Sequence, residues 1–141
     1  MHPSREPTFL PLTVAVARSA TAPDGPAQSS ASVVRQRAEE ANTAAAACWS
    51  ALLGGCESAD RRALPSRLRA LAEATSLYVG TGWWCRHGSS HRRRVAEAQL
   101  RINDAVREGD GAEFAEAFVG YDQAIATAVA SVQSRLESST P

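Results

Sequence analysis

The chain has 141 residues, with 15 arginines, no lysine, 15 acidic side chains and a formal net charge of zero. This length suits one domain with its own core, and no run of apolar residues reaches the roughly 20 that a transmembrane helix needs. Charge is unevenly distributed: residues 61–101 hold nine arginines and two acids, a local +7, and residues 102–141 hold two arginines and seven acids, a local −5. These segments either pair within the fold or present a basic surface to an anionic partner.

The cysteine count and the N-terminal sequence both bear on the compartment. The three cysteines are Cys48, Cys56 and Cys85. An odd number without a disulfide framework is typical of reduced thiols in the cytoplasm. The apolar stretch FLPLTVAVA follows Arg5 and Glu6 and is interrupted by Pro11, features that do not fit a cleaved signal peptide. We therefore expect a cytoplasmic protein.

Residues 1–30 contain five of the seven prolines and end in a polar stretch rich in serine and alanine. This composition predicts a flexible N-terminal tail that is dispensable for folding. Within it, LTVAVA at residues 12–17 predicts a short strand or a docking segment. The tail could also fold on a partner.

Helical periodicity begins after the tail. The spacing of apolar residues predicts a first helix over about 31–53 and a second that starts near Pro65, since proline suits a first helical turn. The two stripes that carry these predictions are Val34, Ala38, Ala41, Ala45, Cys48 and Leu52 in the first helix, and Leu64, Leu68, Leu71, Thr75 and Tyr78 in the second.

A third helix is expected to start at an N-cap formed by Ser89 or Ser90, and a turn at EGDG, residues 108–111, leads into a fourth. Their stripes are Val95, Ala98, Ile102, Ala105 and Val106, and then Phe114, Phe118, Tyr121, Ile125, Val129, Val132 and Leu136. The sequence thus predicts an all-α antiparallel bundle of about four helices over residues 31–138. Its stripes are rich in alanine, which buries little area, so we expect a second subunit or a ligand to complete the core.

The segment GTGWWCRHGSSHRRR, residues 80–94, does not fit a regular helix. Cys85, His87 and His91 have ligand types that zinc prefers, and Cys48 or Cys56 could add a fourth. Their spacing matches no complete zinc signature, and the neighbouring arginines would repel a cation. The sequence therefore predicts no bound metal and no cofactor.

The same segment holds Arg86 and Arg92–Arg94, for which three interpretations stay open. Arginines beside aromatic rings suit nucleic-acid phosphates and bases. Three consecutive arginines in a first helical turn oppose the helix dipole, so they could instead hold a phosphate, a carboxylate or an acidic protein surface. The third interpretation is structural: these arginines pair with the acids of the C-terminal hairpin. Those acids are Glu108, Asp110, Glu113 and Glu116.

Trp83 and Trp84, between glycines, are expected to close the open end of the bundle, or alternatively to form a binding surface. The motifs of hydrolases, nucleotide-binding loops and zinc proteases are absent from the sequence. Neither His87 nor His91 has a partner that would make it a general base. The sequence thus predicts a protein that is not an enzyme.

The stretch VAEAQLRINDAVREGDGAEFAEAFVGYDQAIATAVASV resembles the helical hairpin of FCD-type effector domains in GntR-family regulators. The resemblance covers residues 95–132 and implies an all-α bundle that binds a small carboxylate, often through a metal. The position of that family's metal-binding aspartate is Phe118 here, and that of its first histidine ligand is Asp122. Residues 1–60 contain no winged helix of the kind that usually precedes such domains.

Taken together, these patterns predict a small regulatory or adaptor protein that acts by protein–protein interaction, with homodimerisation as an additional expectation. We expect the contact surface near residues 83–94. The alternatives are a nucleic-acid-binding accessory protein and a small-anion sensor, the latter holding a carboxylate near Tyr78 and the tryptophans. The candidate binding residues are Trp83, Trp84, Arg86, His87, His91, Arg92, Arg93 and Arg94.

Overall fold

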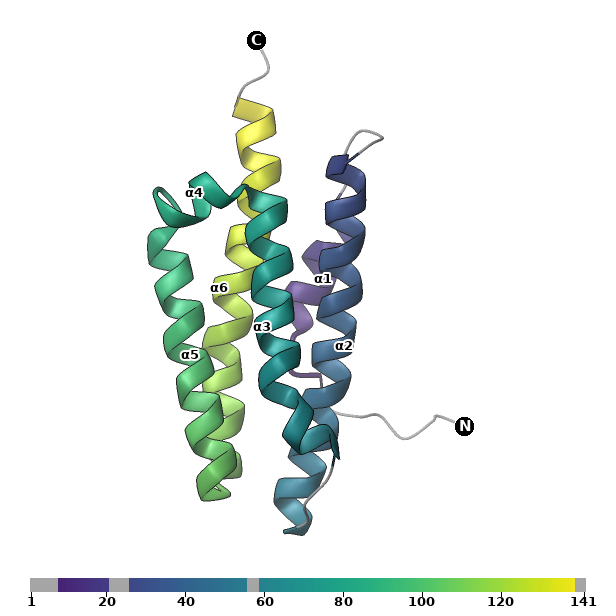
Figure 1. Cartoon of the computed structure of the whole chain (residues 1–141), viewed down its shortest axis with the longest axis vertical. Helices are drawn as coiled ribbons and strands as arrows, with labels where there is room; N and C mark the ends of the chain where they lie inside the picture. Colours follow the sequence, from purple (N-terminus) through teal and green to yellow (C-terminus); the bar gives the residue numbers. More distant parts are fainter. Residues whose placement is uncertain (1–7, 21–25, 56–58, 139–141) are drawn as a thin grey trace.

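The computed structural model describes residues 8–20, 26–55 and 59–138. These ranges form six helices and contain no strand, so the all-α class is confirmed for the described part of the chain (Figure 1). The helices are α1 (Pro11–Ser19), α2 (Pro26–Gly54), α3 (Ala59–Val79), α4 (Thr81–Cys85), α5 (Ser89–Glu108) and α6 (Gly111–Ser138).

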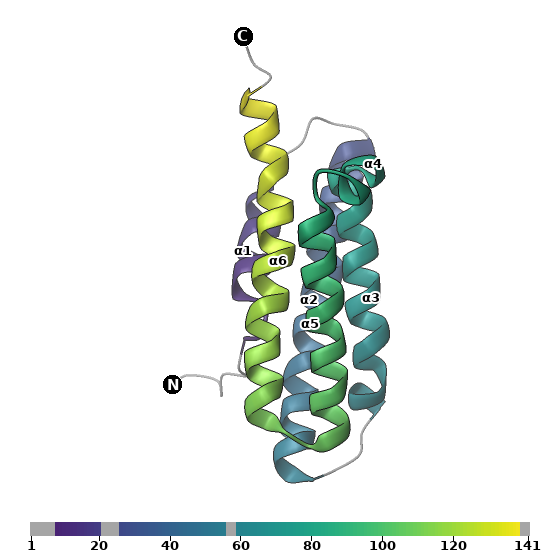
Figure 2. The same cartoon turned by 90° about the vertical axis from the view of Figure 1, so that its left-hand side faces the viewer.

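Two antiparallel hairpins, α2–α3 and α5–α6, lie side by side and form the four-helix body (Figures 1 and 2). The short α1 packs against α2 and α6, and α4 crosses the top of Figure 1 from the end of α3 to the start of α5. The last turns of α6 extend beyond the other helices at this same end. Among the described residues, no helix combines the length and apolar character that a membrane span requires.

The prediction of a flexible N-terminal tail is wrong for residues 8–20 and for residues 26–30, which begin α2. LTVAVA is not a short strand: it forms most of α1, which packs against α2 and α6, in agreement with the alternative prediction of a docking segment. Pro11 occupies the start of this helix, where a missing N–H costs nothing. The side chains of Phe9, Leu10, Thr13 and Ala17 are buried against the bundle. Residues 1–7 and 21–25, which the same prediction covered, lie outside the described residues.

Two polar side chains hold α1 in place. The Asn42 Oδ1 atom on α2 accepts hydrogen bonds from the backbone N–H groups of Phe9 (2.8 Å) and Leu10 (3.0 Å). On α6, the buried carboxylate of Asp122 accepts from the N–H groups of Leu12 (3.0 Å) and Thr13 (2.8 Å). A helix leaves its first N–H groups without partners and carries partial positive charge at its start. Asp122 therefore caps α1 from another helix and keeps its own buried charge satisfied.

The four predicted helical stripes face the core. All of their described side chains are buried except Leu52, Tyr78, Val106 and Val132, which are half-buried and pack against the core. Leu136 belongs to α6, but its side chain lies outside the described part. Apolar periodicity was therefore sufficient to place the buried face of each of the four long helices.

An aromatic cluster compensates for the alanine-rich helix contacts. Phe9, Trp49, Phe114 and Phe118 form a group in which Phe9 lies 5.7 Å, 5.4 Å and 5.3 Å, centroid to centroid, from the other three rings. The fully buried Tyr121 extends the cluster and donates its hydroxyl to the Leu68 carbonyl at 2.6 Å. The N-terminal segment of the same chain thus contributes to the core, so a thin core is no longer an argument for a second subunit.

Helix α3 starts earlier than predicted, at Ala59 instead of near Pro65. Leu64 is fully buried, and Arg61 donates a hydrogen bond to the Val106 carbonyl at the end of α5 (2.9 Å). These tertiary contacts outweigh the cost of a proline inside a helix, which is the loss of one backbone hydrogen bond together with steric strain. The α5–α6 turn is as predicted: Gly109 adopts a left-handed φ of 68°, and the Asp110 carboxylate accepts from the Glu113 N–H.

Candidate functional site

Helix α4 closes one end of the bundle with its two tryptophans. Trp84 is buried, and Trp83 is half-buried against the core. Backbone bonds fix the segment at both ends: the Trp84 N–H donates to the Gly80 carbonyl at 2.9 Å, and the Gly88 N–H donates to the Trp83 carbonyl at 2.7 Å. Of the two predicted roles of the tryptophans, this geometry favours the end cap, because Trp84 is not exposed to a partner.

The Trp83 ring is surrounded by groups from three segments. The Arg135 guanidinium lies over the ring, 4.5 Å from its centroid, and also donates to the Val79 carbonyl at 3.0 Å. The His91 imidazole stacks on the ring at 6.0 Å with an interplanar angle of 18°. A Cβ atom at Gly88 would lie 2.4 Å from Trp83 Cζ3, so glycine is required here by contact with the ring. Arg135 thus joins the end of α6 to the α3–α4 junction.

Four arginines and a histidine beside this cap form an exposed group that we call the basic edge. Its members are Arg86, His87, Arg92, Arg93 and Arg94. All five side chains are exposed, and within the described residues none of the four arginines makes an ion pair. The basic edge therefore presents charge that the described fold does not use internally.

The start of α5 differs from the prediction. Its N-cap is Gly88 and not Ser89 or Ser90, and no side chain caps it. Arg92 to Arg94 are consequently the fourth to sixth residues of the helix, so only Arg92 lies in the first turn, where the dipole acts most strongly. Consecutive helical residues point about 100° apart, so the three guanidinium groups diverge. They cover a broad surface and do not converge on one small site.

The predicted pairing of Arg92–Arg94 with the hairpin acids is wrong. The antiparallel α5–α6 hairpin places Glu108, Asp110 and Glu113 at the opposite end of α5, about 20 Å away along a helix that rises 1.5 Å per residue. Glu113 instead binds Arg101, with oxygen–nitrogen distances of 2.8 Å and 3.0 Å. This contact holds the pKa of the Glu113 carboxyl below its usual value.

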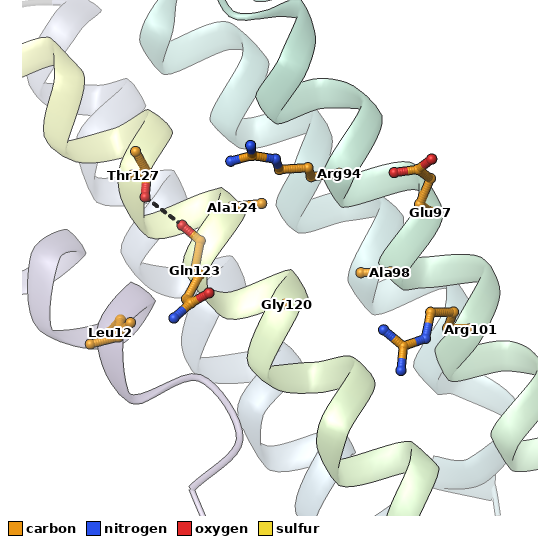
Figure 3. Close-up of a pocket in the computed structure, with 9 residues that line it drawn as sticks. All are labelled: Leu12, Arg94, Glu97, Ala98, Arg101, Gly120, Gln123, Ala124 and Thr127. Carbon is orange, nitrogen blue, oxygen red and sulfur yellow. Dashed lines mark hydrogen bonds between the residues drawn. The ribbon is translucent and has the colours of Figure 1, made fainter.

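One arginine of the basic edge reaches a pocket between α5 and α6 (Figure 3). This open pocket of about 740 Å³ is lined by Leu12, Arg94, Glu97, Ala98, Arg101, Gly120, Gln123, Ala124 and Thr127. Arg94 and Arg101 extend from α5 toward α6, and Leu12 of α1 lies across the groove. Neither tryptophan lines this pocket.

A second pocket, of about 260 Å³, lies between α1 and α6 and includes Tyr78. Burial raises the pKa of the Tyr78 hydroxyl, although Arg135 partly opposes this. Its other lining residues are Ala15, Val16, Ser19, Ala20, Val129, Ala130 and Gln133, so the residues of the basic edge lie outside it. The anion-sensor interpretation had placed arginine, tryptophan and Tyr78 around one ligand, but the pocket of Arg94 and the pocket of Tyr78 are separate.

The cysteines and histidines considered as metal ligands are dispersed. Cys85 and His87 are exposed at the end cap, whereas His91 stacks on Trp83, where its Nδ1 atom is buried without a hydrogen-bond partner in the described structure. Cys48 is buried in α2, where desolvation raises the pKa of its thiol to about 11 and Arg61 opposes the shift. Cys56 lies outside the described residues. No group of three or more His, Cys, Asp or Glu side chains suited to a metal occurs in the described part.

Comparison with known proteins shows no relative: no family model, curated protein or solved structure matches the chain. The resemblance to GntR-family effector domains therefore stays a prediction. Phe118, which stands where that family has a metal-binding aspartate, is buried in the aromatic cluster. Asp122, at the position of the family's first histidine ligand, caps α1. Sequence reasoning did not identify this role, because an aspartate inside a helical stripe gives no local signal of its partner.

Proposed function

We propose that this chain is a non-catalytic regulatory or adaptor protein that binds an acidic protein surface through the basic edge. The observation that carries the proposal is the exposure of Arg86 and Arg92–Arg94 without an ion pair in the described fold. Arginine forms bidentate hydrogen bonds with carboxylates, which suits it to recognise Asp and Glu side chains. Since His87 is exposed among them, it belongs to the same contact surface.

The geometry favours a protein surface over a small anion. The guanidinium groups of Arg92, Arg93 and Arg94 point in different directions, which suits several separate carboxylates better than one ligand. The packed end cap holds the backbone beside the basic edge in a fixed position, because Trp84 is buried and Trp83 packs against Arg135 and Gly88. A surface whose backbone is already ordered loses little conformational entropy on binding. The cytoplasm, inferred from the cysteine content, is the compartment in which we propose that binding occurs.

The test uses three forms of the protein as baits: wild type and two variants. Each bait is chemically crosslinked to its neighbours in the cell that produces the protein, and the recovered proteins are compared. R86E/R92E reverses two charges of the basic edge, and R62E/R69E makes the same change at exposed arginines on α3 that have no ion pair within the described structure. We expect wild type and R62E/R69E to recover the same protein and R86E/R92E to lose it. Equal recovery by all three baits, or no protein recovered by wild type, would contradict the proposal.

Nucleic acid is the competing outcome, and salt distinguishes it. Phosphate contacts release counterions, so binding to nucleic acid weakens linearly in log–log form as salt increases. If nuclease treatment abolishes recovery, and the purified protein binds a duplex with a steep salt slope that R86E/R92E reduces, the partner is nucleic acid and the adaptor function is refuted. Recovery that resists nuclease supports an acidic protein partner.

A further inference from the structure

The exposed side of α5 carries a stripe of alternating charge, which we call the α5 stripe. Its members are Arg94, Glu97, Arg101 and Asp104. Steps of three, four and three residues keep all four side chains within an arc of about 80° on the helix surface. All four are exposed, and the first three line the pocket in Figure 3. The stripe reads positive, negative, positive, negative along the helix.

This order of charges is complementary to itself when two copies of α5 lie antiparallel. With residue 99 at the two-fold axis, Arg94 faces Asp104 of the second copy and Glu97 faces Arg101 of the second copy. The symmetry repeats both contacts, so all four side chains of each stripe meet the opposite charge. An in-register parallel pair would place like charges together. Helix α5 runs from Ser89 to Glu108, so its midpoint nearly coincides with this axis and the two helices overlap along their full length.

The charged side chains of the stripe have donor and acceptor atoms left for such contacts. Within the described residues, neither Arg94 nor Glu97 makes an ion pair. Arg101 uses its Nε and Nη2 atoms on Glu113, which leaves the Nη1 donors. Asp104 contacts Arg107 on the same helix, and both side chains are exposed. Only the Oδ1 atom of Asp104 makes this contact, so its Oδ2 atom can accept a hydrogen bond from a second cation.

An apolar side chain lies beside the stripe, halfway along α5. Leu100 is 65% exposed and points about 60° from Glu97 and 40° from Asp104, just outside the arc of the stripe. It lies one residue from the proposed axis, so the two copies of Leu100 would meet there.

We propose that the chain forms an antiparallel homodimer through the α5 stripe, with Leu100 next to the two-fold axis. Arg94 belongs to both the stripe and the basic edge. The two proposals are still tested separately, because R86E/R92E changes no residue of the stripe: Arg92 lies on the opposite side of α5 and Arg86 precedes the helix. A contact made by one helix from each copy is small, so the dimer is weak and its population depends on concentration. Charge complementarity selects the partner and the register.

The experiment is a charge exchange measured by sedimentation equilibrium of the full chain. R94E/R101E makes the stripe wholly acidic and E97R/D104R makes it wholly basic. Alone, each variant should show a dimer dissociation constant at least tenfold above wild type. An equimolar mixture should form a heterodimer, and the fourfold variant R94E/E97R/R101E/D104R should dimerise again. R62E/R69E, which carries the same change in net charge as R94E/R101E elsewhere, should behave as wild type.

Wild type that stays monomeric up to about 1 mM, a concentration at which even a very weak complex is populated, would overturn the proposal. The proposal also fails if R94E/R101E or E97R/D104R dimerises as wild type does, or if their mixture forms no heterodimer. Circular dichroism of each variant checks that the helices are intact. Because every substituted side chain is exposed, we expect no loss of helix.

Cysteine crosslinking tests the orientation in a background with C56S and C85S. In the antiparallel pair, the two copies of residue 100 are about 3 Å apart along the helix axis and the two copies of residue 90 about 27 Å apart. L100C should therefore form a disulfide with itself and S90C should not, whereas a mixture of S90C and E108C chains should crosslink. Self-crosslinking of S90C would show a parallel pair and overturn the proposed register, as would failure of both L100C and the S90C/E108C mixture.

Discussion

Gly88 offers a sharp test of the end cap. In G88A the new methyl group would lie 2.4 Å from Trp83 Cζ3, 2.6 Å from Cε3 and 2.9 Å from Cη2. An ordinary contact is about 3.5–4.0 Å, so the indole must move by about 1 Å. That movement disrupts its contact with Arg135. Overpacking of this kind costs about 1–3 kcal/mol and a cation–π contact about 0.5–1 kcal/mol, so we expect G88A to lose about 2 kcal/mol of unfolding free energy.

The matched control is G82A. Gly82 lies in α4, six residues from Gly88, and an added Cβ there would meet nothing within 4 Å. Alanine favours a helix over glycine by about 0.5–1 kcal/mol, so G82A should be neutral or slightly stabilising. Chemical denaturation gives the unfolding free energy, and tryptophan fluorescence reports the ring environment. Equal stability of G88A and G82A, with unchanged fluorescence, would refute the account of Trp83 as a tightly fitted cap.

Four further predictions concern α1 and the cysteines. D122N should lose about 2–4 kcal/mol of unfolding free energy, because an amide presents one oxygen to two N–H groups that now bind a buried carboxylate. The same carboxylate-to-amide change at the exposed Glu73, E73Q, should change stability by less than about 0.5 kcal/mol in the same melts. A chain that begins at Pro26 should lose about 3–6 kcal/mol of unfolding free energy from the missing burial of Phe9 and Leu10 alone. An unchanged melting temperature would show instead that the N-terminal segment is dispensable for folding. At pH 8 the Cys48 thiolate fraction is about one in a thousand, so a thiol reagent should label Cys85 and leave Cys48 unmodified until the protein unfolds. Because burial raises the pKa of Cys48 from its ordinary 9.0 to about 11, the stability that its neutral thiol contributes is complete below pH 9 and is lost toward pH 11. In alkaline melts, C48A should therefore lose less stability than wild type between pH 9 and pH 11. Burial also raises the pKa of Tyr121, which adds the same further loss at higher pH to both proteins.

The four long helices could be predicted because burial of one helix face requires apolar residues at the helical period, and each of these helices carries such a stripe. Helix α1 could not be predicted, since the β-branched residues over 13–16 locally favour an extended chain, and its helical state depends on contacts with Asn42 and Asp122. One signal was present but not used: Leu10, Thr13 and Ala17 lie at helical spacing, and Pro11 stands where a helix would start. Tertiary contact outweighed local preference at this segment.

The candidate site likewise has features that could be predicted from the sequence and others that could not. That Arg92–Arg94 and the acids near Glu108 lie at opposite ends of one hairpin follows from the antiparallel connection alone, so the pairing prediction was avoidable. The role of Gly88 was not accessible from sequence, because it depends on a ring five residues away and not on backbone conformation. The charge alternation from Arg94 to Asp104 is visible in the sequence, but its exposure is known only from the fold.

The cap that Asp122 provides to α1 also sets an order for folding during synthesis. The hydrogen bond from Leu12 to Asp122 spans 110 residues, and the one from Thr13 spans 109. At the roughly 5–20 residues per second of translation, Phe9 and Leu10 emerge many seconds before the helix that will cover them. The α2–α3 hairpin needs only local contacts and can form early, whereas α1 must wait for α6. In the interval the nascent chain exposes an apolar N-terminal segment, and this is the stage at which it depends most on protection from aggregation.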